Sequence, residues 1–113
     1  MIVLNDVHIA ANRSAGTTPA SAANLKQFTL NSLCIFLNTA NEDVLIAGDL
    51  FDGFIVPNSD LLATYRIFDK WLERGHKLYA IRGNHDASKN SALISSFDLL
   101  GALLEGKATF ITK

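Results

Sequence analysis

Three short segments of the sequence carry side chains that bind divalent cations or transfer protons. They are Asp6–His8, Gly48–Asp52 and Gly83–Asp86. Together they supply carboxylates, imidazoles and an amide oxygen, which are common ligands of divalent metal ions in proteins. Each segment alone is a weak signal, because Asp-x-His and Gly-Asp pairs are frequent in turns. Their joint occurrence, each close behind an apolar stretch, predicts a metal-centred site.

The elements that must position these segments alternate along the chain. Apolar stretches predict strands at residues 2–4, 44–47, 77–81 and 108–112. Helical periodicity predicts helices at about residues 19–38, 59–74 and 91–105. Strands that alternate with helices are typical of a parallel α/β sheet with crossover helices. Since the carboxyl ends of neighbouring parallel strands share one edge, the three segments are expected to converge there.

The first predicted helix is apolar on two sides. One stripe consists of Leu30, Leu33, Cys34 and Leu37, and the other of Leu25, Phe28, Ile35 and Phe36. A helix that is apolar on two sides is normally buried on two sides. Either a large core covers both stripes, or a partner chain covers the second one.

Composition excludes several classes of protein. The 113 residues carry 10 Lys and Arg against 11 Asp and Glu, so a net charge of −1 gives no global attraction for nucleic acid. Cys34 is the only cysteine, which excludes an intrachain disulfide and a cysteine-based zinc site. The sequence has no apolar stretch of membrane-span length, no phosphate-binding P-loop and no Gly-x-Ser-x-Gly motif. We expect one soluble, cytoplasmic domain over residues 1–113, with no membrane partner.

In their order, the three segments resemble the signature of the calcineurin-like metallophosphoesterase superfamily. The resemblance extends from residue 1 to about residue 90 and rests on Asp6-x-His8, Gly48-Asp49-x-x-Asp52 and Gly83-Asn84-His85-Asp86. It is greatest to the SbcD-type branch, the nuclease subunits of DNA double-strand-break repair. The long first crossover favours this branch, as does Gly53, which stands where protein phosphatases usually have arginine.

The resemblance implies a two-metal site. Asp6 and His8 would bind the first metal, Asp49 would bridge both metals, and Asn84 would bind the second. The mixture of imidazole and carboxylate favours manganese, although zinc or iron would accept the same ligands.

The resemblance also implies roles in catalysis. His85 would act as general acid at the leaving oxygen, oriented by Asp52, while a metal-bound hydroxide attacks phosphorus. The implied substrate is DNA. Arg13 and Arg82 are weaker candidates for contact with phosphate.

The histidines that complete both metal sites in the family have no counterpart here, because no histidine follows His85. The second metal would keep only Asp49 and Asn84 in this chain. The third histidine, His76, precedes the strand at 77–81 and is expected to be solvent-exposed at the opposite edge.

The family fold resembles two facing sheets, so the resemblance implies a partial metallophosphoesterase α/β sandwich. Either a second copy or another polypeptide supplies the missing half, or the chain is an inactive binding module that regulates an SbcD-type nuclease. A phosphomonoesterase or a small-molecule phosphodiesterase of the same superfamily is a further alternative.

Overall fold

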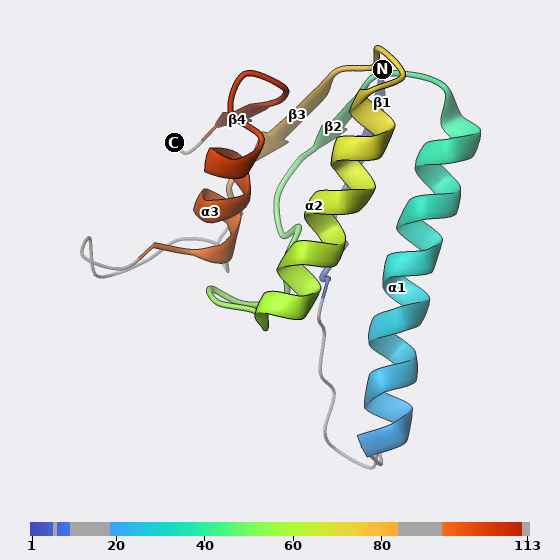
Figure 1. Ribbon diagram of the computed structural model, residues 1–113, viewed down its shortest axis with the longest axis vertical. Helices are drawn as coiled ribbons and strands as arrows, with labels where there is room; N and C mark the ends of the chain where they lie inside the picture. The colour runs from blue at the N-terminus through green and yellow to red at the C-terminus, as the bar shows by residue number, and fades with distance from the viewer. Residues whose placement is uncertain (6, 10–18, 84–93, 112–113) are drawn as a thin grey trace.

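In the computed structural model, three helices lie on one face of a four-stranded sheet (Figure 1). The structure describes residues 1–5, 7–9, 19–83 and 94–111, and of residues 19–26 only the backbone. Its elements are β1 (Ile2–Leu4), α1 (Pro19–Ala40), β2 (Val44–Ile46), α2 (Asn58–Leu72), β3 (Leu78–Ile81), α3 (Ser96–Leu103) and β4 (Thr109–Ile111). The alternation of strand and helix predicted from the sequence is confirmed.

The strands lie side by side in the order in which they occur in the chain, and all are parallel. Val3, Leu45, Tyr79 and Thr109 form one row across the sheet. Each strand lies beside the one before it, and the order runs across the sheet in one direction. Right-handed crossovers between such strands place every helix on the same face of the sheet. The smallest dimension of the molecule, 21 Å, is that of one sheet layer and one helix layer.

The core lies between the sheet and the helices. The side chains of Val44, Ile46, Leu78 and Ala80 alternate along β2 and β3 and are at most 1% exposed. The helices cover them with buried residues from α1, α2 and α3, which are Leu30, Leu33, Leu37, Leu61, Phe68, Trp71, Phe97 and Leu100. Because strand side chains alternate between faces, the intervening residues point away from the helices.

The other face of the sheet is apolar and has no covering layer among the described residues. Val3 is 55% exposed and Ile111 is 41% exposed, while Leu45 and Tyr79 are half-buried. Parallel sheets are usually covered on both faces. The open face therefore has the apolar composition that is typical of a sheet face covered by another layer.

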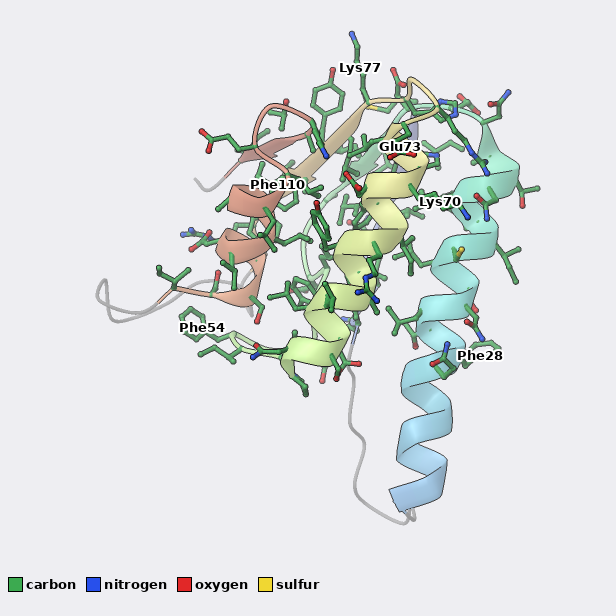
Figure 2. All side chains as sticks on the ribbon, viewed as in Figure 1. Phe28, Phe54, Lys70, Glu73, Lys77 and Phe110 are labelled. Carbon is green, nitrogen blue, oxygen red and sulfur yellow. The ribbon has the colours of Figure 1, made fainter. Side chains whose placement is uncertain are left out.

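One of the two stripes of α1 packs into the core, and part of the other does not. Leu30, Leu33 and Leu37 are buried, whereas Phe28 is 68% exposed and Ile35 is 65% exposed. Figure 2 shows Phe28 on the side of α1 that faces away from α2. The expectation that a large core covers both stripes is wrong for Phe28 and Ile35, because the described helix that packs against α1 is α2, on the other side of α1. The side chain of Leu25 lies outside the described part of the chain.

The start of α3 and the end of α2 differ from the predicted positions, and residues at the helix ends explain the difference. Helix α3 begins at Ser96 rather than at residue 91, because Ser95 is its N-cap and accepts a hydrogen bond from the Asp98 amide (3.0 Å). Helix α2 begins after Pro57, as predicted, and ends at Leu72, where Gly75 has a φ of 92° and turns the chain toward β3.

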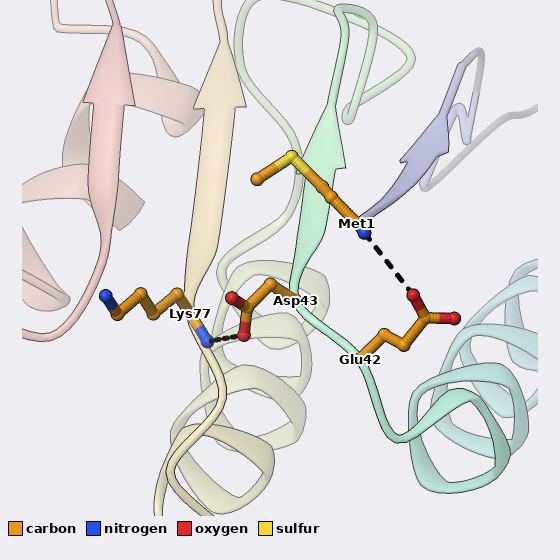
Figure 3. A network of polar contacts seen from close by, with 4 residues as sticks. All are labelled: Met1, Glu42, Asp43 and Lys77. Atoms are coloured by element: carbon orange, nitrogen blue, oxygen red, sulfur yellow. Dashed lines mark hydrogen bonds and ion pairs between the residues drawn. The ribbon is translucent and has the colours of Figure 1, made fainter.

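At the amino edge of the sheet, polar contacts hold the starts of three strands together (Figure 3). The terminal ammonium of Met1 lies 3.3 Å from Glu42 Oε1, and Asp43 Oδ1 accepts a hydrogen bond from the Lys77 amide (2.9 Å). His76 is half-buried, contrary to the sequence-based expectation, because its ring stacks on Trp71 at a centroid distance of 5.2 Å. Among the described residues, no helix has both the length and the apolarity that a membrane crossing needs.

Candidate metal centre

The loops that follow β1 and β2 are joined by backbone hydrogen bonds beyond the ends of the strands. The His8 amide donates to the Asp49 carbonyl (3.0 Å), and the Ile9 amide donates to the Leu50 carbonyl (2.8 Å). The Asp52 amide then donates back to the Ile9 carbonyl (2.9 Å). Ile9 and Leu50 are fully buried and anchor this ladder in the core. The ladder brings two of the three predicted segments side by side at the carboxyl edge of the sheet.

Both of these loops contain residues in the left-handed region of backbone conformation. His8 has a φ of 51°, Asp49 a φ of 52°, and Gly48, which precedes it, a φ of 115°. A side chain held in this region costs on the order of 1 kcal/mol and persists only where its surroundings fix it. His8 and Asp49 are two of the predicted metal ligands, so the backbone strain coincides with the predicted site.

The loop after β3 touches the loop after β2 at a glycine. A Cβ atom at Gly83 would lie 2.3 Å from the Asp49 amide nitrogen and 2.5 Å from Asp49 Oδ1. No side chain fits at such distances, so glycine is required for the two loops to meet. The contact places the Asp49 carboxylate directly against the residue that precedes Asn84.

Asp52 lies beside His8. Its Oδ1 atom is 3.1 Å from His8 Nδ1, and both side chains are partly exposed, 32% for His8 and 42% for Asp52. A histidine whose Nδ1 faces a carboxylate presents its other ring nitrogen, Nε2, to a metal. The structure thus places Asp52 on a predicted metal ligand; the predicted contact of Asp52 with His85 lies outside the described residues.

Arg82 follows β3 at the same edge of the sheet, and contacts with α3 and β4 hold it there. Its guanidinium makes an ion pair with the carboxylate of Asp98 in the first turn of α3, and its amide donates to the Ile111 carbonyl (2.8 Å). The side chains of Arg82 and Asp98 are 25% and 28% exposed. Contact between Arg82 and phosphate stays a prediction, and the structure gives the arginine an acidic partner.

The sequence analysis missed Asp98 as the residue that holds Arg82. The available signal was Ser95-x-x-Asp98, a pattern of the capping-box type that marks a helix start and brings the carboxylate into its first turn. The ion pair between Asp98 and Arg82 could not be predicted from the sequence, because it depends on how α3 packs beside β3.

Four predicted site residues, Asp6, Arg13, Asn84 and His85, lie outside the described part of the chain. Within the described ranges, no group of three His, Cys, Asp or Glu side chains is close enough to hold a metal ion. The donors that are described fit a divalent cation in kind. His8 and Asp49 combine an imidazole with a carboxylate at one edge, and Asp52 orients the imidazole.

Comparison with known proteins identifies the family. The family model for the calcineurin-like phosphoesterase matches residues 1–109. No curated protein matches the chain.

Proposed function

The chain belongs to the calcineurin-like phosphoesterase family, and on this premise we propose that it hydrolyses phosphodiester bonds of DNA. The family is one of metal-dependent phosphoesterases that use divalent cations. The observation that carries the proposal is the contact between Asp49 and Gly83. It supports a single site built from the loops after β1, β2 and β3.

The proposed metal ligands are Asp6, His8, Asp49 and Asn84. His8 would bind through Nε2, because its Nδ1 faces Asp52. Divalent cations at these residues would act as Lewis acids and lower the pKa of water, which is the chemistry that phosphoester hydrolysis needs. We propose manganese as the cation, since the donor set mixes imidazole with carboxylate.

The protein's own residues would orient the reaction and move its proton. Asp52 would fix the ring of His8, and its second carboxylate oxygen would be available to His85. His85 would then donate a proton to the leaving oxygen, a step for which the pKa of histidine is suited. Arg13 and Arg82 would contact phosphate, the latter after exchange of Asp98 as its partner.

DNA is the proposed substrate because the three sequence segments resemble those of the SbcD-type branch. Gly53, which follows Asp52, stands where protein phosphatases usually have arginine. The net charge of −1 gives the chain no general affinity for a polyanion. Bound cations at the carboxyl edge would therefore provide the positive charge that a phosphate backbone meets.

We also propose that a second copy or another polypeptide contributes further metal ligands. Within these 113 residues no histidine follows His85, and Asp49 and Asn84 are the ligands that they offer to a second metal. The apolar open face of the sheet and the exposed Phe28 and Ile35 of α1 support association with a partner.

Cleavage of end-labelled linear DNA by the purified chain, with added Mn²⁺, tests the proposal. The informative variant is Asp49→Asn, because asparagine tolerates the positive φ of this position while the carboxylate is lost. We expect its cleavage rate to fall by more than about 100-fold, more than the loss typical of residues that only support a ligand. Glu73→Ala, which removes one exposed acidic residue at the end of α2, is the matched control and should keep the wild-type rate.

A specific activity that rises with protein concentration would support association between copies. Equal cleavage by wild type and Asp49→Asn, or cleavage that survives removal of metal by a chelator, would contradict the proposed mechanism. Absence of cleavage by the folded wild type would favour the alternative of an inactive binding module. That alternative predicts altered activity of an SbcD-type nuclease when the chain is added.

A further inference from the structure

A groove of about 210 Å³ lies between α1 and α2, on the helical side of the molecule. Its walls are mostly apolar and come from both helices. The lining residues are Cys34, Leu37 and Asn38 of α1 and Arg66, Ile67, Lys70 and Trp71 of α2. None of them belongs to the proposed phosphoesterase site.

Trp71 lines the groove with a side chain that is almost fully buried. The side chain is only 1% exposed, and its Nε1–H has no hydrogen-bond acceptor among the described residues. Its ring stacks on His76, which leaves the indole N–H outside that contact. Trp71 therefore contributes an apolar surface to the groove rather than a donor that a ligand could reach.

Two cations complete the groove. Arg66 and Lys70 are one helical turn apart on α2 and exposed, and neither has a hydrogen bond or an ion pair with another described residue. Figure 2 shows Lys70 extending from α2 toward α1. Like charges at this spacing repel each other, so a shared anion would relieve the repulsion.

The acidic residues of the same helix do not supply that anion. Asp69 is paired with Lys107 on the far side of α2, with Nζ 2.6 Å from Oδ1. Glu73 does not line the groove. The only described polar contact within the lining is donated by Asn38 Nδ2 to Cys34 Sγ (3.5 Å).

We propose that this groove binds a small carboxylate with an apolar ring or branched chain. The apolar body would lie against Leu37, Ile67 and Trp71, while the carboxylate would meet Arg66 and Lys70. The volume suits such a ligand, because a cavity of about 150 Å³ is sufficient for benzene. The inference is independent of the proposed phosphoesterase function.

The chain carries its own reporter for this site, since Trp71 is its only tryptophan. Titration with cyclohexanecarboxylate should shift the tryptophan fluorescence and move the single indole cross-peak in a ¹H–¹⁵N spectrum. We expect a dissociation constant on the order of 1 mM for so small a ligand. Bound ligand should also slow alkylation of Cys34, the only cysteine, by iodoacetamide.

Two comparisons separate charge recognition from simple apolar binding. The neutral cyclohexanecarboxamide should bind about tenfold more weakly than the carboxylate. The double variant Arg66→Gln/Lys70→Gln should weaken carboxylate binding by at least the same factor. Arg74→Gln/Lys77→Gln removes the same two residue types outside the groove and should bind as wild type does.

Several results would overturn the proposal. They are equal affinity for the carboxylate and the carboxamide, unchanged affinity in the Arg66/Lys70 variant, and no response of Trp71 to either compound. Loss of binding in the Arg74/Lys77 control to the same extent would also overturn it, because the effect would then be one of net charge alone.

Discussion

Asp49 combines a strained backbone with a side chain that is packed against a neighbouring loop. Its φ of 52° is tolerated by aspartate better than by most residues, and Gly83 leaves room for its amide and its carboxylate. The Asp49 carboxylate can therefore keep its orientation only because Gly83, in the neighbouring loop, has no Cβ atom. At the residue scale, the site is fixed by the contact between Asp49 and Gly83.

The substitution Gly83→Ala tests this contact. A Cβ atom 2.3 Å from the Asp49 nitrogen forces the two loops apart, and we expect the free energy of unfolding to fall by about 1–3 kcal/mol. Urea denaturation measures the change. Gly53→Ala is the matched control, because its Cβ would be 3.9 Å from the nearest atom, and its change should stay within about 0.5 kcal/mol. Equal stability of the two variants would show that the loops do not meet as described.

The substitution Asp52→Ala tests the contact with His8. Without a carboxylate 3.1 Å from Nδ1, the ring of His8 loses its orientation, and we expect the affinity for Mn²⁺ to fall about 10–100-fold. Isothermal titration calorimetry measures the affinity directly, with Glu73→Ala as a control for the loss of one acidic residue. Unchanged affinity in Asp52→Ala would exclude a positioning role, whereas absence of Mn²⁺ binding by the wild type would contradict the proposed function itself.

The types of the site residues could be predicted from the sequence, and their detailed contacts could not. Asp49 and Gly83 were identified because each closely follows an apolar stretch, and parallel strands bring such positions to one edge. The positive φ of His8 and the contact of Asp52 with His8 were not predicted. Both arise from the ladder between the two loops, whose paired residues are 41 or 43 positions apart in the chain.

At the element scale, the ends of α2 and α3 are fixed by contacts with other parts of the chain. Ser96 Oγ accepts a hydrogen bond from the Val56 amide (2.8 Å), and the Ser96 amide donates to the Phe54 carbonyl (2.9 Å). The start of α3 is thereby joined to the loop that follows β2. Helix periodicity predicted that these helices exist, but the start of α3 was misplaced because Ser95 and Ser96 are buried cap residues rather than surface ones.

The ion pair of Lys107 with Asp69 joins the turn before β4 to the last turn of α2. The hydrogen bond and the charge of Asp69 raise the pKa of the Lys107 ammonium above 10.5. A folded-state pKa above the unfolded value means that the pair stabilises the fold below about pH 10.5. The stabilisation is lost as the pH rises through the higher folded value.

We therefore expect Lys107→Gln to be less stable than wild type at neutral pH, with a difference that shrinks above pH 10.5. Thermal unfolding followed by circular dichroism over a series of pH values measures the difference. Lys77→Gln, at an exposed lysine without this partner, is the control. A difference that stayed constant across the alkaline range would show that the pair does not act through charge.

On the scale of the whole molecule, one face of the sheet is covered by helices, and no described part of the chain covers the other. The alternation of strands and helices was predicted, and right-handed crossovers then account for the single helical layer. The exposure of Val3, Ile111, Phe28 and Ile35 could not be predicted from periodicity alone, because an apolar stripe reads the same whether the chain or a partner covers it. Association with a partner is the proposal that these surfaces support.

The order of the strands also bears on how the chain acquires its structure during synthesis. Because each strand pairs only with the one made before it and the one made after it, no later segment has to insert between two earlier ones. The strands therefore leave the ribosome in the order in which they pair. The ladder that joins His8 to Asp49 needs only the first 50 residues or so. The two residues with strained backbone are thus expected to meet before Gly83 closes over Asp49.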